Sequence, residues 1–163
     1  MKRSILTLLF LMMALHAVNA TEAAGPLLIT TDEKWQVSYE GDQVQFYTIK
    51  RTAGETALLM VHRWSAPGNA DQIPTYLEQI AEGFLKEADK NPDLKLTKKG
   101  YEKQPIEGAE FSGEAVIFTV HAGLYQTSFM VSDGDGIWSG QFTGSKELWA
   151  EAIEIIQQLQ RRD

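Results

Sequence analysis

The chain has 163 residues, of which 44% are hydrophobic and 23% are charged, and this composition is typical of an ordinary globular protein of one domain. The net charge of −7 argues against nucleic acid as a partner, because phosphate binding needs clustered lysine and arginine. There are no cysteines, which excludes disulfides, thiolate metal ligands and cysteine nucleophiles.

The N-terminus has the three parts of a secretory signal peptide. Lys2 and Arg3 form a basic start, residues 5–15 form an apolar run, and small residues precede a cleavage position after Ala20. The run is well short of the ~20 residues that a helix needs to cross a bilayer. We therefore expect residues 1–20 to be removed, with a retained, uncleaved anchor as the alternative. We expect the mature chain to have no membrane span and the protein to be periplasmic or secreted. An exported chain without cysteine fits a bacterial periplasm best.

The first part of the mature chain is expected to be a meander of three strands. Residues 35–39 and 44–49 alternate apolar and polar positions around a Gly41-Asp42 turn, which is typical of half-buried strands. Residues 57–64 are apolar at consecutive positions, which predicts a central strand covered on both faces.

The next segment has the strongest helical periodicity in the chain. Asp71 is expected to cap this helix, and Pro74 is tolerated in its first turn, where backbone amides have no partner. Asn91 and Pro92 end it. One face is expected to be buried because apolar residues recur at helical spacing: Ile73, Tyr76, Leu77, Ile80, Ala81, Phe84, Leu85 and Ala88.

A second meander and a second helix are expected to follow. Residues 94–98 are interpreted as an edge strand with lysines on one face, and residues 101–112 as a polar stretch broken by Pro105 and Gly108. Further strands are expected at 115–120, 124–131 and 137–142. A serine-capped helix follows, with a buried stripe of Leu148, Trp149, Ala152, Ile153, Ile156 and Leu159.

This order predicts an α+β fold. Two meanders, each followed by a helix, imply a three-layer α-β-α sandwich around a mostly antiparallel sheet, because strands that are apolar on both faces need a helix on each side. We place a single domain over residues 34–163, after a flexible N-terminal segment at 21–33.

Aromatic and glycine positions in the C-terminal half carry a resemblance to a known family. The positions are 108–110 (GAE), 118–123, Tyr125, Phe129, 138–144 (WSGQFTG) and Trp149. In these the chain resembles the PsbP-like superfamily, which includes the photosystem extrinsic protein, Ran-binding Mog proteins and small bacterial envelope proteins. The similarity extends over about residues 34–160. It implies an α-β-α sandwich that acts as a binding or assembly module without catalysis, and it carries over no catalytic residue.

The chemistry-bearing residues indicate no metal and no cofactor. His62 and His121 lie on predicted strands, but the spacing of a zinc motif is missing, so a hydrogen-bonded histidine is the simpler interpretation. No Gly-x-Ser-x-Gly elbow is present, and Ser139 is interpreted as a polar strand position. The alternative that stays open is a small periplasmic hydrolase in which His62 or His121 works with a glutamate.

The leading hypothesis is an exported, non-catalytic interaction or assembly module whose partner is another envelope protein. The expected binding surface combines aromatic side chains at loop mouths with a lysine-rich edge: Trp64, Tyr101, Trp138, Lys95, Lys98 and Lys99. The lysines are explained by a solvated sheet edge, or alternatively by an anionic partner or headgroup. A carrier of a small apolar ligand, held between sheet and helix, is a further alternative. The sequence leaves the oligomeric state open.

Overall fold

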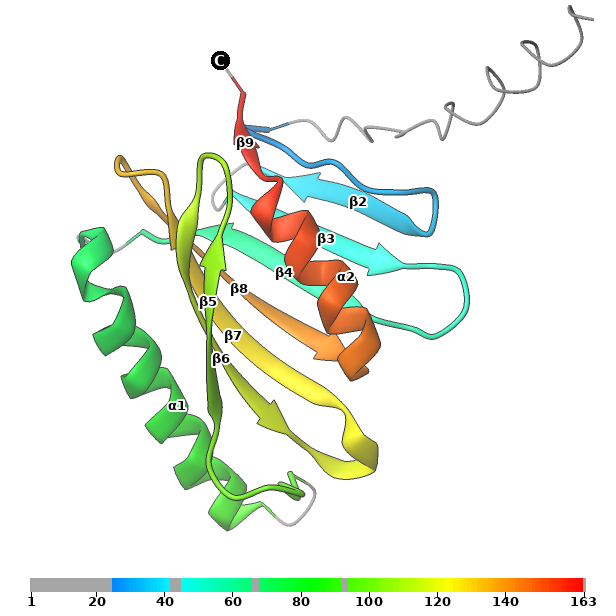
Figure 1. Cartoon of the computed structure of the whole chain (residues 1–163), viewed down its shortest axis with the longest axis vertical. Coiled ribbons are helices and arrows are strands. Elements are labelled where there is room, and N and C mark those ends of the chain that lie inside the picture. Colours follow the sequence, from blue (N-terminus) through cyan, green and yellow to red (C-terminus); the bar gives the residue numbers. More distant parts are fainter. Residues whose placement is uncertain (1–24, 42–44, 66–67, 92–93, 163) are drawn as a thin grey trace, which may run out of the picture.

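The computed structural model of the chain describes residues 25–41, 45–65, 68–91 and 94–162. The expected signal peptide lies outside these ranges. The elements in chain order are β1 (Leu27–Leu28), β2 (Trp35–Glu40), β3 (Phe46–Arg51), β4 (Leu58–Arg63), η1 (Ala70–Gln72), α1 (Ile73–Lys90), β5 (Glu102–Glu107), β6 (Ser112–Thr119), η2 (His121–Gly123), β7 (Tyr125–Ser132), β8 (Ile137–Gly144), α2 (Lys146–Gln157) and β9 (Gln160–Arg161), as Figure 1 shows.

Seven strands form one sheet in the order β2-β3-β4-β8-β7-β6-β5, and every pairing in it is antiparallel. Each meander is continuous in space, and the two join where β4 pairs with β8 and His62 lies opposite Ser139. The expected α+β class, with two helices packed on an antiparallel sheet, is confirmed.

The edge strand differs from the one that the sequence predicts. Residues 94–98 do not form a strand, and their pairing is the isolated bridge between Leu96 and Val120. The edge is β5, which lies inside the 101–112 stretch that Pro105 marks as irregular. Proline is tolerated in β5 because an edge strand has a neighbour on one side alone, so an outward N–H has no partner to lose.

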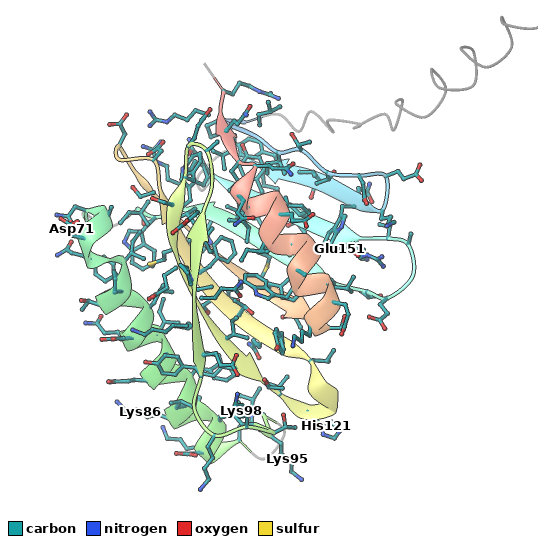
Figure 2. All side chains as sticks on the ribbon, viewed as in Figure 1. Asp71, Lys86, Lys95, Lys98, His121 and Glu151 are labelled. Atoms are coloured by element: carbon teal, nitrogen blue, oxygen red, sulfur yellow. The ribbon has the colours of Figure 1, made fainter. Side chains whose placement is uncertain are left out.

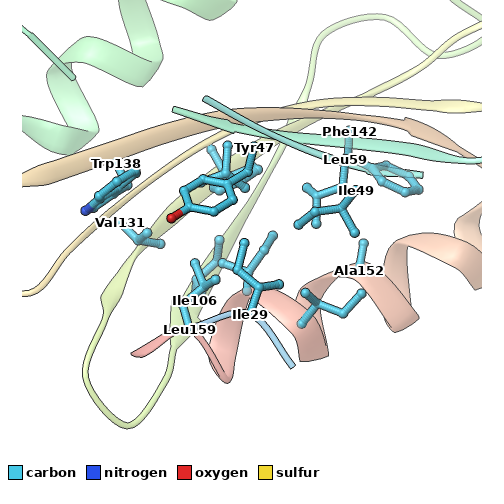
Figure 3. Packing of buried hydrophobic residues seen from close by; sticks show 14 of the residues in the cluster. Ile29, Tyr47, Ile49, Leu59, Ile106, Val131, Trp138, Phe142, Ala152 and Leu159 are labelled. Carbon is cyan, nitrogen blue, oxygen red and sulfur yellow. The ribbon is translucent and has the colours of Figure 1, made fainter. Parts of the chain in front are cut away.

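One face of the sheet is sealed by α2. Side chains alternate between faces along each strand, and on this face Tyr47, Ile49, Leu59, Val61 and Phe142 are 0% exposed. Figure 3 shows Tyr47, Ile49, Leu59 and Phe142 on the side of the helix, with Trp138 on the same side. From the helix the buried residues are Leu148, Trp149, Ala152, Ile155 and Ile156, which confirms the expected stripe except that Ile153 is half-buried and Ile155 is added.

Two short terminal segments complete the cover of this face. The segment at 21–33, expected to be flexible, contributes β1 from its described part, and β1 pairs with β9. Leu27 and Ile29 are 1% exposed, and Leu27 N–H donates a 2.8 Å hydrogen bond to the Tyr47 hydroxyl. Burial raises the pKa of Tyr47. The segment before Trp35 is therefore part of the domain core, because its apolar residues bury against β3 and the chain end.

α1 packs against the opposite face and begins differently from the sequence expectation. Asp71 does not cap it, since a short turn, η1, precedes the helix and Gln72 occupies the cap position. Pro74 lies in the first turn and Asn91 ends the helix, both as expected. Among the described residues, no helix combines the length and the apolar character that crossing a membrane requires.

Candidate functional site

α1 covers only part of its face of the sheet. Its buried residues, with Leu77 and Ala81 at the centre, pack on β6, on β7 and on the first residue of β8. Figure 1 shows the helix lying along that side of the sheet, away from β2 and β3. A helix is about 10 Å wide and strands are about 4.8 Å apart, so one helix covers two to three strands of seven. The strands beyond β7 therefore keep this face open.

We call this region the open sheet face. Its residues lie on β3, β4 and β8, and strand pairing places them in adjacent rows on the α1 side: Phe46, Thr48, Leu58, Met60, His62, Ser139, Gln141 and Thr143. Phe46, Leu58 and Met60 are half-buried, whereas their neighbours in the chain, Tyr47 and Leu59, are fully buried on the α2 side. The same strands thus carry one sealed face and one accessible face.

A histidine and a serine form the polar centre of the open sheet face. His62 Nε2 and Ser139 Oγ share a hydrogen bond of 2.8 Å between two central strands. The His62 ring stacks on Phe46, with 6.4 Å between the ring centroids and an interplanar angle of 29°. Burial lowers the pKa of His62 below its ordinary value of 6.5, so the imidazole is neutral at pH 7.

A serine hydrogen-bonded to a neutral histidine is the first requirement of nucleophilic catalysis. Acyl transfer also needs donors for the oxyanion. Ser139 lies inside β8, which pairs with β4 on one side and β7 on the other, so the backbone amides around it belong to the sheet ladders. Ser139 is also 5% exposed. The pair therefore provides polar groups on this face, and within the described residues the backbone amides next to Ser139 are occupied by strand pairing.

The expected partnership of a histidine with a glutamate is not formed within the described part of the chain. Neither His62 nor His121 makes an ion pair with a described carboxylate. His121 is exposed in η2, the connection between β6 and β7, and it is not one of the residues of the open sheet face. The described residues also contain no group of three or more histidine, aspartate or glutamate side chains suited to a metal ion.

The structure does not bring together the three aromatic residues that were expected at one rim. Trp138 is 4% exposed and packs on Tyr47 in the α2 side of the core, 6.1 Å between ring centroids, so it lines no surface. Tyr101 packs on Phe118 under α1. Trp64 follows His62 on the same side of the sheet and packs on Tyr76 at 5.8 Å, which places it at the border of the open sheet face.

The three lysines of the expected surface lie elsewhere. Lys95, Lys98 and Lys99 are exposed in the segment between α1 and β5, and Lys98 forms an ion pair with Glu102. This segment is a loop held against the end of β6, since Thr97 N–H donates to Thr119 O at 2.9 Å. The lysines therefore precede the edge strand and do not lie on it, although Lys98 contacts its first residue, Glu102, and they are not part of the open sheet face.

Sequence reasoning missed Phe46 and Met60 as partly exposed residues, and it missed the contact of Ser139 with His62. The alternation of the strands indicated their positions, but a face that is apolar at alternate residues predicts burial unless the covering element is counted. The number of strands was the signal that could have found the open region. One helix is too narrow for seven strands, and β1 and the chain end extend the cover on the α2 side alone among the described residues.

The comparisons with known proteins leave the family open. No family model matches the chain, and no curated protein matches it. A crystal structure of a protein from Bacteroides thetaiotaomicron VPI-5482 aligns with 84% of this chain at 20% identity and a TM-score of 0.34. The chain spans 45% of the length of that structure. A similarity of this size supports no conclusion about fold or function.

Proposed function

We propose that the protein is an exported, non-catalytic interaction module of the bacterial envelope, built as a PsbP-like α-β-α sandwich, and that it binds another envelope protein through the open sheet face. The observation that carries this proposal is the half-buried state of Phe46, Leu58 and Met60 in the middle of a sheet whose other face is fully covered. Large apolar side chains left accessible together are typical of binding surfaces.

The composition of the open sheet face favours a protein partner. None of its eight residues is charged, although Lys50 lies on the same side of β3 opposite Leu58, and Glu40 lies opposite Phe46. Depletion of charge with enrichment of aromatic residues and methionine is the pattern found at the centre of protein interfaces. Lys50 and Glu40 flank the region and are exposed, which resembles the polar rim of such an interface.

Individual residues take distinct roles in the proposed interface. Phe46 and Met60 are the apolar anchors, and Trp64 borders them beside α1. The pair of His62 and Ser139 fixes the orientation of the Phe46 ring through stacking and offers polar groups to a partner. This surface replaces the loop rim expected from Trp64, Tyr101 and Trp138.

Site-specific photo-cross-linking in intact cells tests the proposal. A photoreactive residue at Gln141 or Thr143, both exposed on the open sheet face, is expected to capture one defined envelope protein. The same residue at Glu154, exposed on the outer side of α2, is the matched control and is expected to capture none. The adduct should disappear when Phe46→Asp is added. Equal capture at Glu154, or capture that survives Phe46→Asp, would refute the proposal.

A hydrolase is the second candidate, because the 2.8 Å contact of His62 and Ser139 has the geometry of a base and a nucleophile. A fluorophosphonate probe on the purified full chain separates the two candidates. The interaction module is expected to remain unlabelled. Labelling that is lost in Ser139→Ala and retained in Ser112→Ala would favour the hydrolase, since Ser112 is an exposed strand serine outside the pair.

A carrier of a small apolar ligand, the remaining alternative, is tested by native mass spectrometry after gentle purification. The interaction module is expected to show the mass of the polypeptide alone.

A further inference from the structure

The two ends of the sheet differ in how their charged side chains are paired, since Asp133 and Asp135 at one end form ion pairs with Arg161. The turns that join β5 to β6 and β7 to β8 lie at one end, with Glu110, Asp133 and Asp135. The β6–β7 connection and the loop after α1 lie at the other end, with Lys95, Lys98 and Lys99. Figure 2 shows Lys86, Lys95, Lys98 and His121 gathered at this second end and Asp71 at the first.

The lysines at this basic end are accessible and partly without counter-charge. Residues 94–101 (LKLTKKGY) contain three lysines and no acidic residue. Lys98 pairs with Glu102, whereas Lys95 and Lys99 make no ion pair with any carboxylate in the described ranges. All three are exposed. The last turns of α1 carry two carboxylates, of which Glu87 is paired with Lys90 and Asp89 is exposed.

An exposed apolar side chain lies at the same end. Leu124 is 40% exposed, which is more than the half-buried Phe46, Leu58 and Met60 of the open sheet face. Its carbonyl oxygen accepts a 2.8 Å hydrogen bond from Val120 N–H, and Val120 pairs with Leu96 of the lysine segment. Leu124 and the lysines are therefore carried by two segments that contact each other.

We infer that the basic end binds the anionic surface of a phospholipid bilayer, with Leu124 inserted among the headgroups. A bilayer presents negative charge and, directly beneath it, apolar chains, so lysines around one exposed leucine match it in both respects. A free phosphate would account for the lysines but would leave Leu124 unexplained. This surface is separate from the open sheet face, so the inference stands independently of the proposed function.

The net charge of −7 does not oppose this orientation. β7 has eight residues and is therefore about 27 Å long. The acidic turn after it, which includes Asp133, lies that far from the basic end. Because the Debye length is about 8 Å at physiological ionic strength, those carboxylates are screened from the bilayer, while the lysines in contact with it are not.

Vesicle co-sedimentation of the full chain tests the inference. Two kinds of vesicle are compared, phosphatidylcholine alone and phosphatidylcholine containing phosphatidylglycerol. The charge-dependent binding of each variant is its partition coefficient on the anionic vesicles divided by that on the neutral vesicles. Every variant keeps the apolar residues 5–15, so their contribution cancels when the ratios of two variants are compared. Each lysine near an anionic surface contributes about fivefold. Lys95→Gln/Lys99→Gln is therefore expected to lower the ratio by about 25-fold.

Two further variants complete the design. Lys34→Gln/Arg162→Gln removes the same charge from exposed positions before β2 and after β9, and it is expected to leave the ratio unchanged. Leu124→Ser is expected to lower binding to the anionic vesicles by about fivefold. The inference would be overturned if the control variant lost as much of the ratio as Lys95→Gln/Lys99→Gln. It would also be overturned if the unchanged protein bound both kinds of vesicle equally, or if Lys95→Gln/Lys99→Gln kept its full binding to the anionic vesicles.

Discussion

Trp149 Nε1 donates a 2.8 Å hydrogen bond to Gln104 Oε1, and this contact joins α2 to the edge strand β5. At the other edge, Glu151 of the same helix accepts hydrogen bonds of 3.2 Å from Trp35 Nε1 and from Arg51 Nε. α2 is thus bonded to both margins of a seven-stranded sheet. These contacts fix the helix across the strands and explain why the face beneath it is fully buried.

Replacement of Gln104 tests the first of these contacts. Trp149 is 4% exposed, so Gln104→Leu leaves its indole N–H without an acceptor in the core. The free energy of unfolding is expected to fall by about 1–3 kcal/mol, measured by urea denaturation. Gln104→Glu, which keeps an oxygen acceptor, is the control and is expected to lose less. Equal losses in both variants would show that the hydrogen bond does not stabilise the protein.

Two glycines in regular structure are expected to respond to alanine in opposite directions. A Cβ at Gly140 would collide with the Met60 carbonyl oxygen and the Phe129 ring, and neither can move without disrupting the sheet. Gly140→Ala is expected to cost about 1–3 kcal/mol or more. At Gly83, in α1, nothing lies within 4 Å of the added carbon, so Gly83→Ala is expected to stabilise the protein by about 0.5–1 kcal/mol. Thermal unfolding of both variants checks this pair, and a neutral Gly140→Ala would contradict the packing described.

The elements that the sequence predicted well are those with local signals. The stripe of α2 follows helical spacing, and Ser145 caps the helix by accepting a hydrogen bond from Leu148 N–H. Both depend on residues within a few positions of each other. β5 was missed because Pro105 and its charged neighbours lack strand propensity, and the pairing with β6 overrides that local preference.

The candidate site depended on information that is not local. His62 and Ser139 are 77 positions apart, and their contact arises only because β4 pairs with β8. Trp138 and Ser139 are adjacent in the chain and both are buried, but they point to opposite faces of the sheet, Trp138 into the core under α2 and Ser139 toward His62 on the α1 side. The strand pattern alone does not assign helices to faces.

The turn between β7 and β8 offers a comparison of two aspartates. Asp133 is 7% exposed on its side chain and accepts hydrogen bonds of 3.0 Å from the backbone amides of Asp135 and Gly136, whereas the side chain of Asp135 is 74% exposed. Both contact Arg161. Asp133→Ala is expected to lower the free energy of unfolding by about 1–2 kcal/mol, because two turn amides lose their acceptor. Asp135→Ala is expected to change it little, and urea denaturation of the pair distinguishes them. Matching losses would mean that the ion pair, and not the turn, holds this end.

The burial of His62 predicts a loss of stability in mild acid. Its pKa is lowered in the folded protein, whereas in the unfolded chain it has the ordinary value of about 6.5. Above pH 6.5 both states hold the neutral imidazole and the histidine has no effect on stability. Below it the unfolded chain binds a proton that the native site resists, so the free energy of unfolding falls as the pH decreases from 6.5 toward the folded pKa, with a slope of up to about 1.4 kcal/mol per pH unit.

Urea denaturation at several pH values, with the His62 ring followed by NMR, measures this effect. His62→Gln is expected to remove the part of the pH dependence that begins near 6.5, while His121→Gln, at an exposed position, is expected to retain it. A His62 resonance that titrates at or above 6.5 would contradict the burial of the imidazole. A partner bound to the open sheet face would bury the ring further and should lower its pKa again, since desolvation is the cause of the shift. The His62 titration therefore also reports whether a captured partner occupies this face.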